Sequence, residues 1–420
     1  MSTVVKIPPV CTGGARAGVG GAIGGARAGA GGAIGGARAS SARRVNGEGL
    51  PPGWHYDEDT GAIMRDVIHR MGRRCRNWDY HGRGTYLITM VLADRSKPIF
   101  GQLTGASPDA AAIALSPLGL AIDAHLRRIS EFTPEIEVLG VQVMPDHIHV
   151  VLRVNRRMAK PLGIALRGFK GGASKIFWGQ SAVGTADAKR PLFAEGFVDN
   201  ILGDGEAVAN ALRYLADNPR RLWEKRAHPE LFRVLCDVEA AGGRFAAIGN
   251  RALLKAPHIY QVQVSRSFFA YRRDAKGAIL KNVPPRIATG EFKEKLEGFL
   301  EAAAHGAVLL SPCISEGERE IARIAFEKGL KVITLANKGF SPLYKPGGRL
   351  FNATAAGNLL MLAPIAWPYQ PGEKKMTRID ACILNCIAQW LSGDGAVEIK
   401  YRGVEPSEID RLAAEAIGRG

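Results

Sequence analysis

Residues 144–154 of the chain read MPDHIHVVLRV, an apolar run that His147 and His149 interrupt. Pro145 and Asp146 are typical of a turn, and the β-branched residues that follow favour an extended strand. Side chains two residues apart in a strand point to the same face, so we expect the two imidazoles to stand side by side. Two neutral imidazoles this close can bind one divalent metal ion and leave coordination positions open. The alternative is that both are polar residues on the wet face of an amphipathic strand.

The charge of the segment that begins at this strand has one sign. Between His147 and Ala186 the chain has no Asp or Glu and seven basic residues: Arg153, Arg156, Arg157, Lys160, Arg167, Lys170 and Lys175. The formal net charge of the whole chain is +16. A solvated helix face usually mixes signs, so this segment predicts a track for phosphate groups and a nucleic-acid partner.

The composition favours a protein of two or three domains in a reducing compartment. The six cysteines among 420 residues are scattered and include no CxxC pair, which argues against a disulfide framework or a zinc site. No apolar run approaches the ~20 residues of a membrane span, and no secretory signal opens the chain. We therefore expect a cytoplasmic protein without a membrane partner.

Residues 1–75 are predicted to be a tail and linker. Residues 11–44 repeat GGARA within a period of eleven, and Gly and Ala at this density cannot bury enough surface to fold. We interpret them as a flexible basic tail, or as translated repeat DNA upstream of a later start at Met64 or Met71.

The elements around the two histidines predict one domain over residues 76–240. Apolar runs predict the strands, Ser116-Pro117 is typical of a helix start, and Asn218-Pro219 is typical of a helix stop. The expected order is strand 85–92, helix 116–132, strand 136–143, the strand with both histidines, helix 161–178, strand 193–202 and helix 206–217. This order predicts a ferredoxin-like α+β sandwich with a central antiparallel sheet.

The last of these helices carries two further candidate residues. Tyr214 and Asn218 are four residues apart, so they lie one turn apart on one helix face. With the histidines they would supply a hydroxyl nucleophile and a third metal ligand, as phosphodiester cleavage requires. Taken singly, Tyr is a common half-buried helix residue and Asn before Pro is a frequent helix stop. Arg220 and Arg221 extend the positive surface, with Trp223 beside them for base stacking.

Four segments of this domain resemble one enzyme family. They read WDYHGRGTYLIT, MPDHIHVVLRV, LFAEGFVDNIL and YLADNPRR, and they fall within residues 76–235. They resemble the REP-associated tyrosine transposases, which belong to the single-tyrosine HUH nucleases (His, hydrophobic residue, His). The resemblance implies that His147, His149 and Asn218 bind Mg²⁺ or Mn²⁺. It also implies that Tyr214 attacks single-stranded or hairpin DNA and becomes joined to the 5′-phosphate.

Residues 245–420 differ in kind from the first half. Strands expected at 259–264, 307–311, 331–335 and 359–362, which are mostly apolar, alternate with helices expected at 290–304 and 317–329, and a packing helix begins at 377. This pattern predicts a doubly wound parallel sheet, with ligands beyond the strand C-termini at 265–266, 311–317 and 345–349. The half resembles the Rossmann-like domain of DNA-processing protein A. A scaffold and a binding domain both remain open.

Together these features predict a bacterial, nucleoid-associated DNA transposase that acts on hairpin or repeat sequences. It would nick single-stranded DNA with a metal ion and transfer the strand through a 5′-phosphotyrosine intermediate. One alternative is a domesticated hairpin-binding protein that no longer cuts. Another is an HUH replication or conjugation nickase, although the chain lacks the phosphate loop GxxxxGK[ST] of helicase domains. A monomer and a homodimer both remain open.

Overall fold

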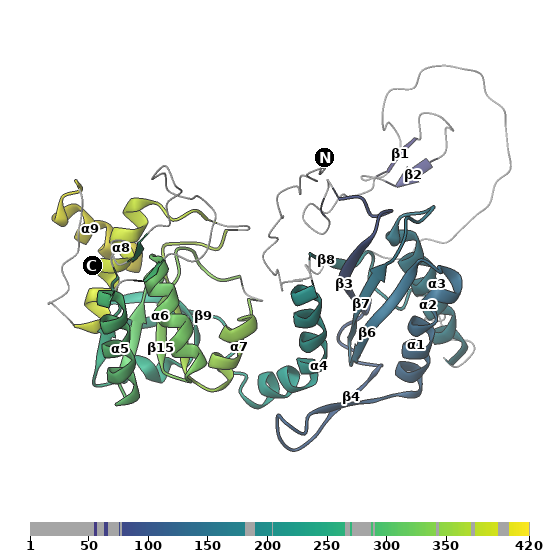
Figure 1. The fold of residues 1–420 in the computed structure, drawn as a ribbon, viewed down its shortest axis with the longest axis horizontal. Helices are drawn as coiled ribbons and strands as arrows, with labels where there is room; N and C mark the ends of the chain where they lie inside the picture. The colour runs from purple at the N-terminus through teal and green to yellow at the C-terminus, as the bar shows by residue number, and fades with distance from the viewer. Residues whose placement is uncertain are drawn as a thin grey trace, which may run out of the picture. The chain divides into compact units, whose positions relative to one another are not determined.

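The computed structural model describes residues 54–56, 63–65, 75, 78–180, 190–203, 205–264, 269–270, 287–288, 290–341, 344–370, 374–393 and 403–419. They belong to two compact units that divide after Pro219, and Figure 1 shows both. The predicted tail, residues 11–44, and the predicted loop Ser265-Arg266 lie outside the described residues. Within the predicted linker, β1 (Trp54–Tyr56) and β2 (Ile63–Arg65) pair as a short antiparallel ladder.

The first unit is built on an antiparallel sheet of four strands in the order β6-β7-β3-β8. The strands are β3 (Gly84–Val91), β6 (Ile136–Met144), β7 (His147–Val154) and β8 (Val198–Leu202). The predicted strands are confirmed, as is the turn at Pro145-Asp146, although β8 begins five residues after residue 193. A separate two-stranded ladder of β4 (Gly101–Thr104) and β5 (Ala112–Leu115) was not predicted.

Helices cover both faces of this sheet. They are α1 (Pro117–Arg127), α2 (Ile129–Phe132), α3 (Leu162–Gln180) and α4 (Gly205–Ala227). Ile148, Val150 and Leu152 of β7 share a core with α1 and α3. Val151 points to the other face and packs against Ala211 of α4. In Figure 1, α1, α2 and α3 accordingly lie on one side of the sheet and α4 on the other.

The prediction that Asn218-Pro219 ends the last helix is wrong. Helix α4 continues through Pro219 to Ala227. A proline inside a helix removes one backbone hydrogen-bond donor, and here both Asn218 and Pro219 are buried. The side-chain amide of Asn218 also donates to the carbonyl oxygen of Tyr214, 2.8 Å away and one turn earlier. Tertiary packing therefore holds the helix across a residue that would end it in isolation.

The second unit is built on a mixed sheet of six strands in the order β11-β14-β15-β16-β10-β9. Strands β11 (Ile259–Gln261), β14 (Val308–Ser311), β15 (Val332–Leu335) and β16 (Leu359–Pro364) are parallel, as predicted. Antiparallel β10 (Gly243–Gly249) and β9 (Leu235–Ala240) extend the sheet and were not predicted. The predicted boundary at 240–245 falls inside this β9-β10 hairpin, whereas the compact units divide after Pro219. A further short ladder pairs β12 (Phe269–Ala270) with β13 (Ile287–Ala288).

Helices also cover both faces of the second sheet. They are a 3₁₀ helix (Arg251–Lys255), α5 (Gly290–Ala304), α6 (Glu316–Glu327), α7 (Gly348–Ala355), α8 (Arg378–Ser392) and α9 (Pro406–Ile417). Alternate residues of β14 pack against the helices on opposite faces of the sheet. Leu310 packs with α8 and α9, and Leu309 packs with α5 and α6. The described residues thus form a mixed α/β protein whose two larger sheets are one antiparallel and one mixed. None of the helices among the described residues is long and apolar enough to span a membrane.

Candidate active site

The two histidines of β7 lie side by side, as the sequence predicts. Their Nε2 atoms are 3.1 Å apart, and the two rings are nearly perpendicular, with centroids separated by 4.7 Å. Two nitrogen lone pairs at this distance would repel each other, so the geometry requires a proton or a cation between His147 and His149. His149 is buried and His147 is half-buried.

The other ring nitrogen of each histidine has its own partner. Nδ1 of His147 lies 2.6 Å from Oδ1 of Asp146, and Nδ1 of His149 lies 2.8 Å from the hydroxyl of Thr89. Thr89 is directly opposite His149 in the β3–β7 register. Sequence reasoning missed both partners. For Asp146 the only signal was its place beside His147, and for Thr89 there was none, because the strand pairing that brings it there is not local.

Asp146 is in turn bound by Arg95. The guanidinium of Arg95 donates through Nε at 2.8 Å and Nη2 at 2.6 Å to Oδ2 of the carboxylate. Burial acts to raise the pKa of Asp146, but the hydrogen bond of His147, followed by the hydrogen bond and charge of Arg95, holds this pKa well below its ordinary value. Asp146 is therefore ionised, and it accepts from His147 through Oδ1 and from Arg95 through Oδ2.

Helix α4 places Tyr214 beside His149 and carries Asn218 one turn later. The Tyr214 ring lies edge-on to the His149 ring with the centroids 5.4 Å apart. Tyr214 is 36% exposed, whereas Asn218 is buried. Because the side-chain Nδ2 of Asn218 donates to the Tyr214 carbonyl, its Oδ1 is the remaining group that can accept or ligate. The structure thus brings together three of the predicted residues, His147, His149 and Tyr214, and places Asn218 one turn after Tyr214 on α4.

The close packing of α4 on the sheet sets this arrangement. Ala211 and Leu215 of α4 pack against Val151, on the face of β7 that also carries the histidines. Gly140 of β6 leaves room for the helix, since a Cβ atom there would lie 2.6 Å from Cδ2 of Leu212. Tyr214 and Asn218 occupy the same side of α4, so the docking of the helix determines their distance from the histidines.

The donor set fits a divalent cation. Two facing imidazole nitrogens and one amide oxygen would leave positions for water or a phosphate oxygen, and nitrogen donors favour Mn²⁺ over Mg²⁺, which prefers oxygen alone. Among the described residues no group of three His, Cys, Asp or Glu side chains could hold a metal ion. That Asn218 supplies the third donor stays a prediction.

The predicted basic track begins with three arginines that the fold pairs with acids. Arg153 approaches Glu137 at 3.4 Å, Arg156 approaches Glu135 at 3.8 Å, and Arg157 binds Asp79 at 2.6 Å. Arg153 lies on the histidine face of β7, by the alternation of the strand. The single sign of charge in the sequence is therefore balanced locally by acids from other segments.

The remaining basic residues of this segment lie elsewhere. Arg167, Lys170 and Lys175 belong to α3, which covers the face of the sheet opposite to the histidines. The Nζ atom of Lys170 donates to the carbonyl oxygens of Ala194 and Gly196. Lys160 and Lys175 line a groove of about 590 Å³ on that same side. These side chains do not join the histidines in one continuous track.

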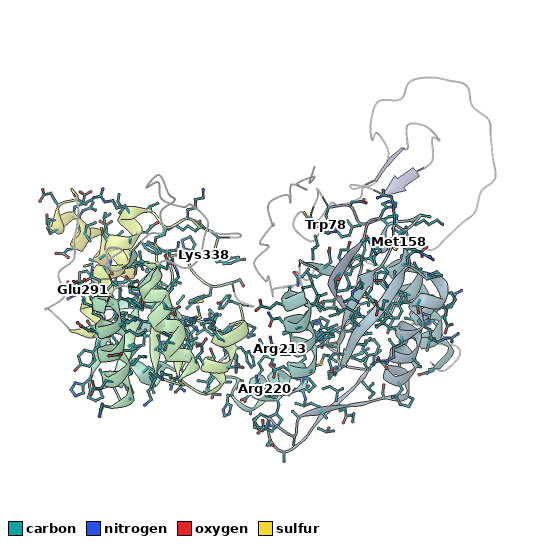
Figure 2. All side chains as sticks on the ribbon, in the orientation of Figure 1. Trp78, Met158, Arg213, Arg220, Glu291 and Lys338 are labelled. Carbon is teal, nitrogen blue, oxygen red and sulfur yellow. The ribbon has the colours of Figure 1, made fainter. Side chains whose placement is uncertain are left out.

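Arg220 and Arg221 lie in the second unit and interact with it. Arg220 donates to Oδ1 of Asn352 at 2.7 Å, and the Arg221 guanidinium lies 3.7 Å from the centroid of the Phe351 ring. Figure 2 shows Arg213 and Arg220 along α4, where seven residues place them two turns apart. That Arg220 and Arg221 bind DNA stays a prediction.

The loops at the carboxyl edge of the parallel strands form hydrogen bonds with other residues of the same chain. The buried carboxylate of Glu318 accepts the N–H of Ile314 at 2.8 Å, and the Ser315 hydroxyl accepts the N–H of Glu318. Burial raises the pKa of Glu318. Lys345 donates to the carbonyl of Phe232. Side chains thus engage the start of α6, where a Rossmann-like domain would bind an anion, and ligand binding at these loops stays a prediction.

Comparisons with known proteins found similarity over about a third of the chain. No family model matches. An uncharacterized protein of Haemophilus influenzae is 20% identical over 179 residues, which are 38% of this chain and 92% of that protein. A REP-associated tyrosine transposase bound to a REP hairpin is 14% identical with a TM-score of 0.25, over 35% of this chain and 72% of the other. A proposed transposase from Deinococcus radiodurans R1 is 14% identical with a TM-score of 0.23, over 34% and 95% of the two chains. Likenesses at these values do not establish a family.

Proposed function

We propose that the chain is a DNA transposase that nicks single-stranded DNA through a tyrosine nucleophile and a divalent metal ion. One observation carries the proposal: the Tyr214 ring lies 5.4 Å from His149, whose Nε2 faces that of His147 at 3.1 Å. The proposal includes a ferredoxin-like HUH fold for the first unit and a Rossmann-like accessory fold for the second. A hairpin or repeat sequence is the proposed substrate, on the strength of the motif resemblance.

Three residues of the site would bind the cation, and Tyr214 would attack the DNA. His147, His149 and the Asn218 amide oxygen would hold the cation, which when bound supplies a Lewis acid for a phosphate oxygen. Tyr214 presents its hydroxyl from a rigid helix at the open side of the site, since its side chain is 36% exposed. Helix α4 therefore delivers both the nucleophile and a ligand, and the substrate phosphate would lie between them.

The reaction exchanges one phosphodiester for another. The Tyr214 oxygen forms a bond to phosphorus as the bond from phosphorus to the 3′-oxygen breaks. The phenol loses its proton to water, and the departing 3′-oxygen takes up a proton to become a free 3′-OH. The 5′-phosphate stays on Tyr214. A 3′-OH of another strand can reverse the step, because a phenolate is a better leaving group than a sugar alkoxide, so strand transfer needs no nucleotide.

The test is the covalent adduct on labelled single-stranded hairpin DNA with Mn²⁺. Wild type should give a protein–DNA band that survives denaturation, and EDTA should abolish it. Tyr214→Phe removes only the hydroxyl and keeps the ring against His149, so it should form no adduct while still binding DNA. Tyr260→Phe is the matched control, since Tyr260 is 40% exposed and lies on β11 of the second unit.

The outcomes separate the candidate functions. An adduct in Tyr214→Phe would identify another nucleophile. Tyr86 is buried in the core, so Tyr80 would be tested next. Tight hairpin binding without any adduct in wild type would favour the non-cutting DNA-binding protein. Equal activity in EDTA and Mn²⁺ would exclude the histidines and Asn218 as metal ligands.

A further inference from the structure

We infer that Asp146, held by Arg95, is the positioning residue that fixes the ring of His147 for metal binding. The inference rests on the proposed function, because it assigns a role within the same metal site. The two histidines differ in how they are held. His149 is buried on the sheet, whereas the His147 side chain retains 20% of its exposure and lies at the first position of β7. Packing alone therefore restrains His149 more than His147.

The chemistry of the two Nδ1 partners also differs. A hydroxyl such as that of Thr89 both donates and accepts, so it is compatible with either tautomer of His149. An ionised carboxylate only accepts, so Asp146 at 2.6 Å requires the proton of His147 to be on Nδ1. A neutral imidazole has one N–H, and its Nε2 then carries the lone pair that faces His149. Asp146 thus selects the tautomer of His147 that can ligate through Nε2.

Arg95 fixes the carboxylate in turn. Its Nε and Nη2 atoms both bind Oδ2, which leaves Oδ1 for His147. The backbone of the turn is anchored as well. Leu92 donates its N–H to the carbonyl of Asp146, and Phe100 donates to the carbonyl of Pro145. These contacts restrict rotation of the carboxylate and movement of the turn, so Arg95, Asp146 and His147 form a line of contacts that ends at the proposed metal site.

The experiment measures Mn²⁺ binding by the full-length protein without DNA, by electron paramagnetic resonance titration. Loss of a partner that orients a metal-binding histidine reduces metal affinity by about 10–100-fold, so Asp146→Ala should raise the Kd for Mn²⁺ by that factor. Arg95→Ala should raise it less, because Asp146 keeps its contact with His147. Asp94→Ala is the matched control and should leave the Kd unchanged, since Asp94 binds Ser96 in the adjacent loop.

A second readout excludes a merely structural effect. ¹⁵N NMR of histidine-labelled protein should show the Nδ1–H tautomer of His147 in wild type and in Asp94→Ala, and a mixture of tautomers in Asp146→Ala. Metal-independent DNA binding should be equal in all variants. If Asp146→Ala does not fold, Asp146→Asn keeps the shape of the turn. Its amide oxygen would accept from Arg95 and leave an Nδ2–H facing Nδ1 of His147, so this variant should also raise the Kd for Mn²⁺. A Kd within twofold of wild type in Asp146→Asn would then overturn the positioning role.

The results distinguish this inference from the proposed function. A Kd for Asp146→Ala within twofold of wild type, or an unchanged His147 tautomer, would overturn the positioning role while the Tyr214 adduct remains. Failure of wild type to bind Mn²⁺ would overturn the metal site and the inference together.

Discussion

Two basic residues of α3 carry the same charge but have different roles in the structure. Arg167 is exposed, whereas the ammonium group of Lys170 donates to two backbone carbonyls just before β8. A partly buried carbonyl oxygen that loses its charged donor is left without a hydrogen bond, which costs stability. Lys170 therefore contributes to the stability of the first unit, and Arg167 is free to contribute to DNA binding.

We predict opposite effects for the two substitutions. Lys170→Met should destabilise the first unit by about 1–3 kcal/mol, measured by urea unfolding with hydrogen exchange of α3 and β8 peptides. Arg167→Ala should change stability by no more than about 0.5 kcal/mol. It should lower the slope of log K against log salt for single-stranded DNA by up to about one unit. A salt slope unchanged in Arg167→Ala would show that this side of α3 does not contact DNA.

At the scale of elements, glycines show where helices approach other chain segments. Gly119 of α1 faces the backbone, since a Cβ atom there would lie 2.0 Å from the carbonyl oxygen of Phe100. Gly168 of α3 has no atom within 4 Å of its Cβ position. Helix propensity alone would favour Ala at either position by about 1 kcal/mol. Only the packing distinguishes the two sites.

Gly119→Ala and Gly168→Ala should therefore change the stability of the first unit in opposite directions. The clash at Gly119 is with backbone, which cannot rotate away, so we expect a net loss of about 1–3 kcal/mol. At Gly168 we expect the free energy of unfolding to rise by about 0.5–1 kcal/mol, because Ala reduces the conformational entropy of the unfolded chain and favours the helix. Urea unfolding of the first unit checks both. Equal effects of the two substitutions would mean that α1 does not lie against residue 100.

For the whole molecule, α4 is the element that the two compact units share. The division falls within this helix, since Pro219 belongs to the first unit and Arg220 to the second. Strand β9 follows α4 and pairs with β10 in the six-stranded sheet. A chain cut at residue 240 would therefore retain β9 without its partner, and an unpaired edge strand promotes association.

Two truncated chains test this division. Residues 76–227 should fold as a monomer and form the Tyr214 adduct, because they contain the four-stranded sheet and all of α4. Residues 76–240 should show unprotected β9 amides in hydrogen exchange and a greater tendency to associate in size-exclusion chromatography. Protected β9 amides in the longer chain would place this strand in the first unit. Loss of folding in both chains would show that the halves share a core.

The sequence by itself determined the groups that share a face of one element. A period of two placed His147 and His149 together on β7, and a spacing of four placed Tyr214 and Asn218 together on α4. Apolar runs likewise predicted the four-stranded sheet, the four parallel strands of the second sheet and most helices. These features depend on backbone geometry over a few residues, and the order of amino acids within each segment is enough to reveal them.

Only the tertiary structure decided which faces meet. Thr89 reaches His149 through the pairing of strands 60 residues apart, and α4 reaches the histidines because it packs on Val151. The residues of the basic segment were divided between two faces of the sheet, and three of its arginines, Arg153, Arg156 and Arg157, lie next to acids from other segments. Pro219 remained inside a helix because packing outweighed one lost hydrogen bond. Local patterns cannot report these outcomes, since they depend on the free energy of contacts between segments far apart in the chain.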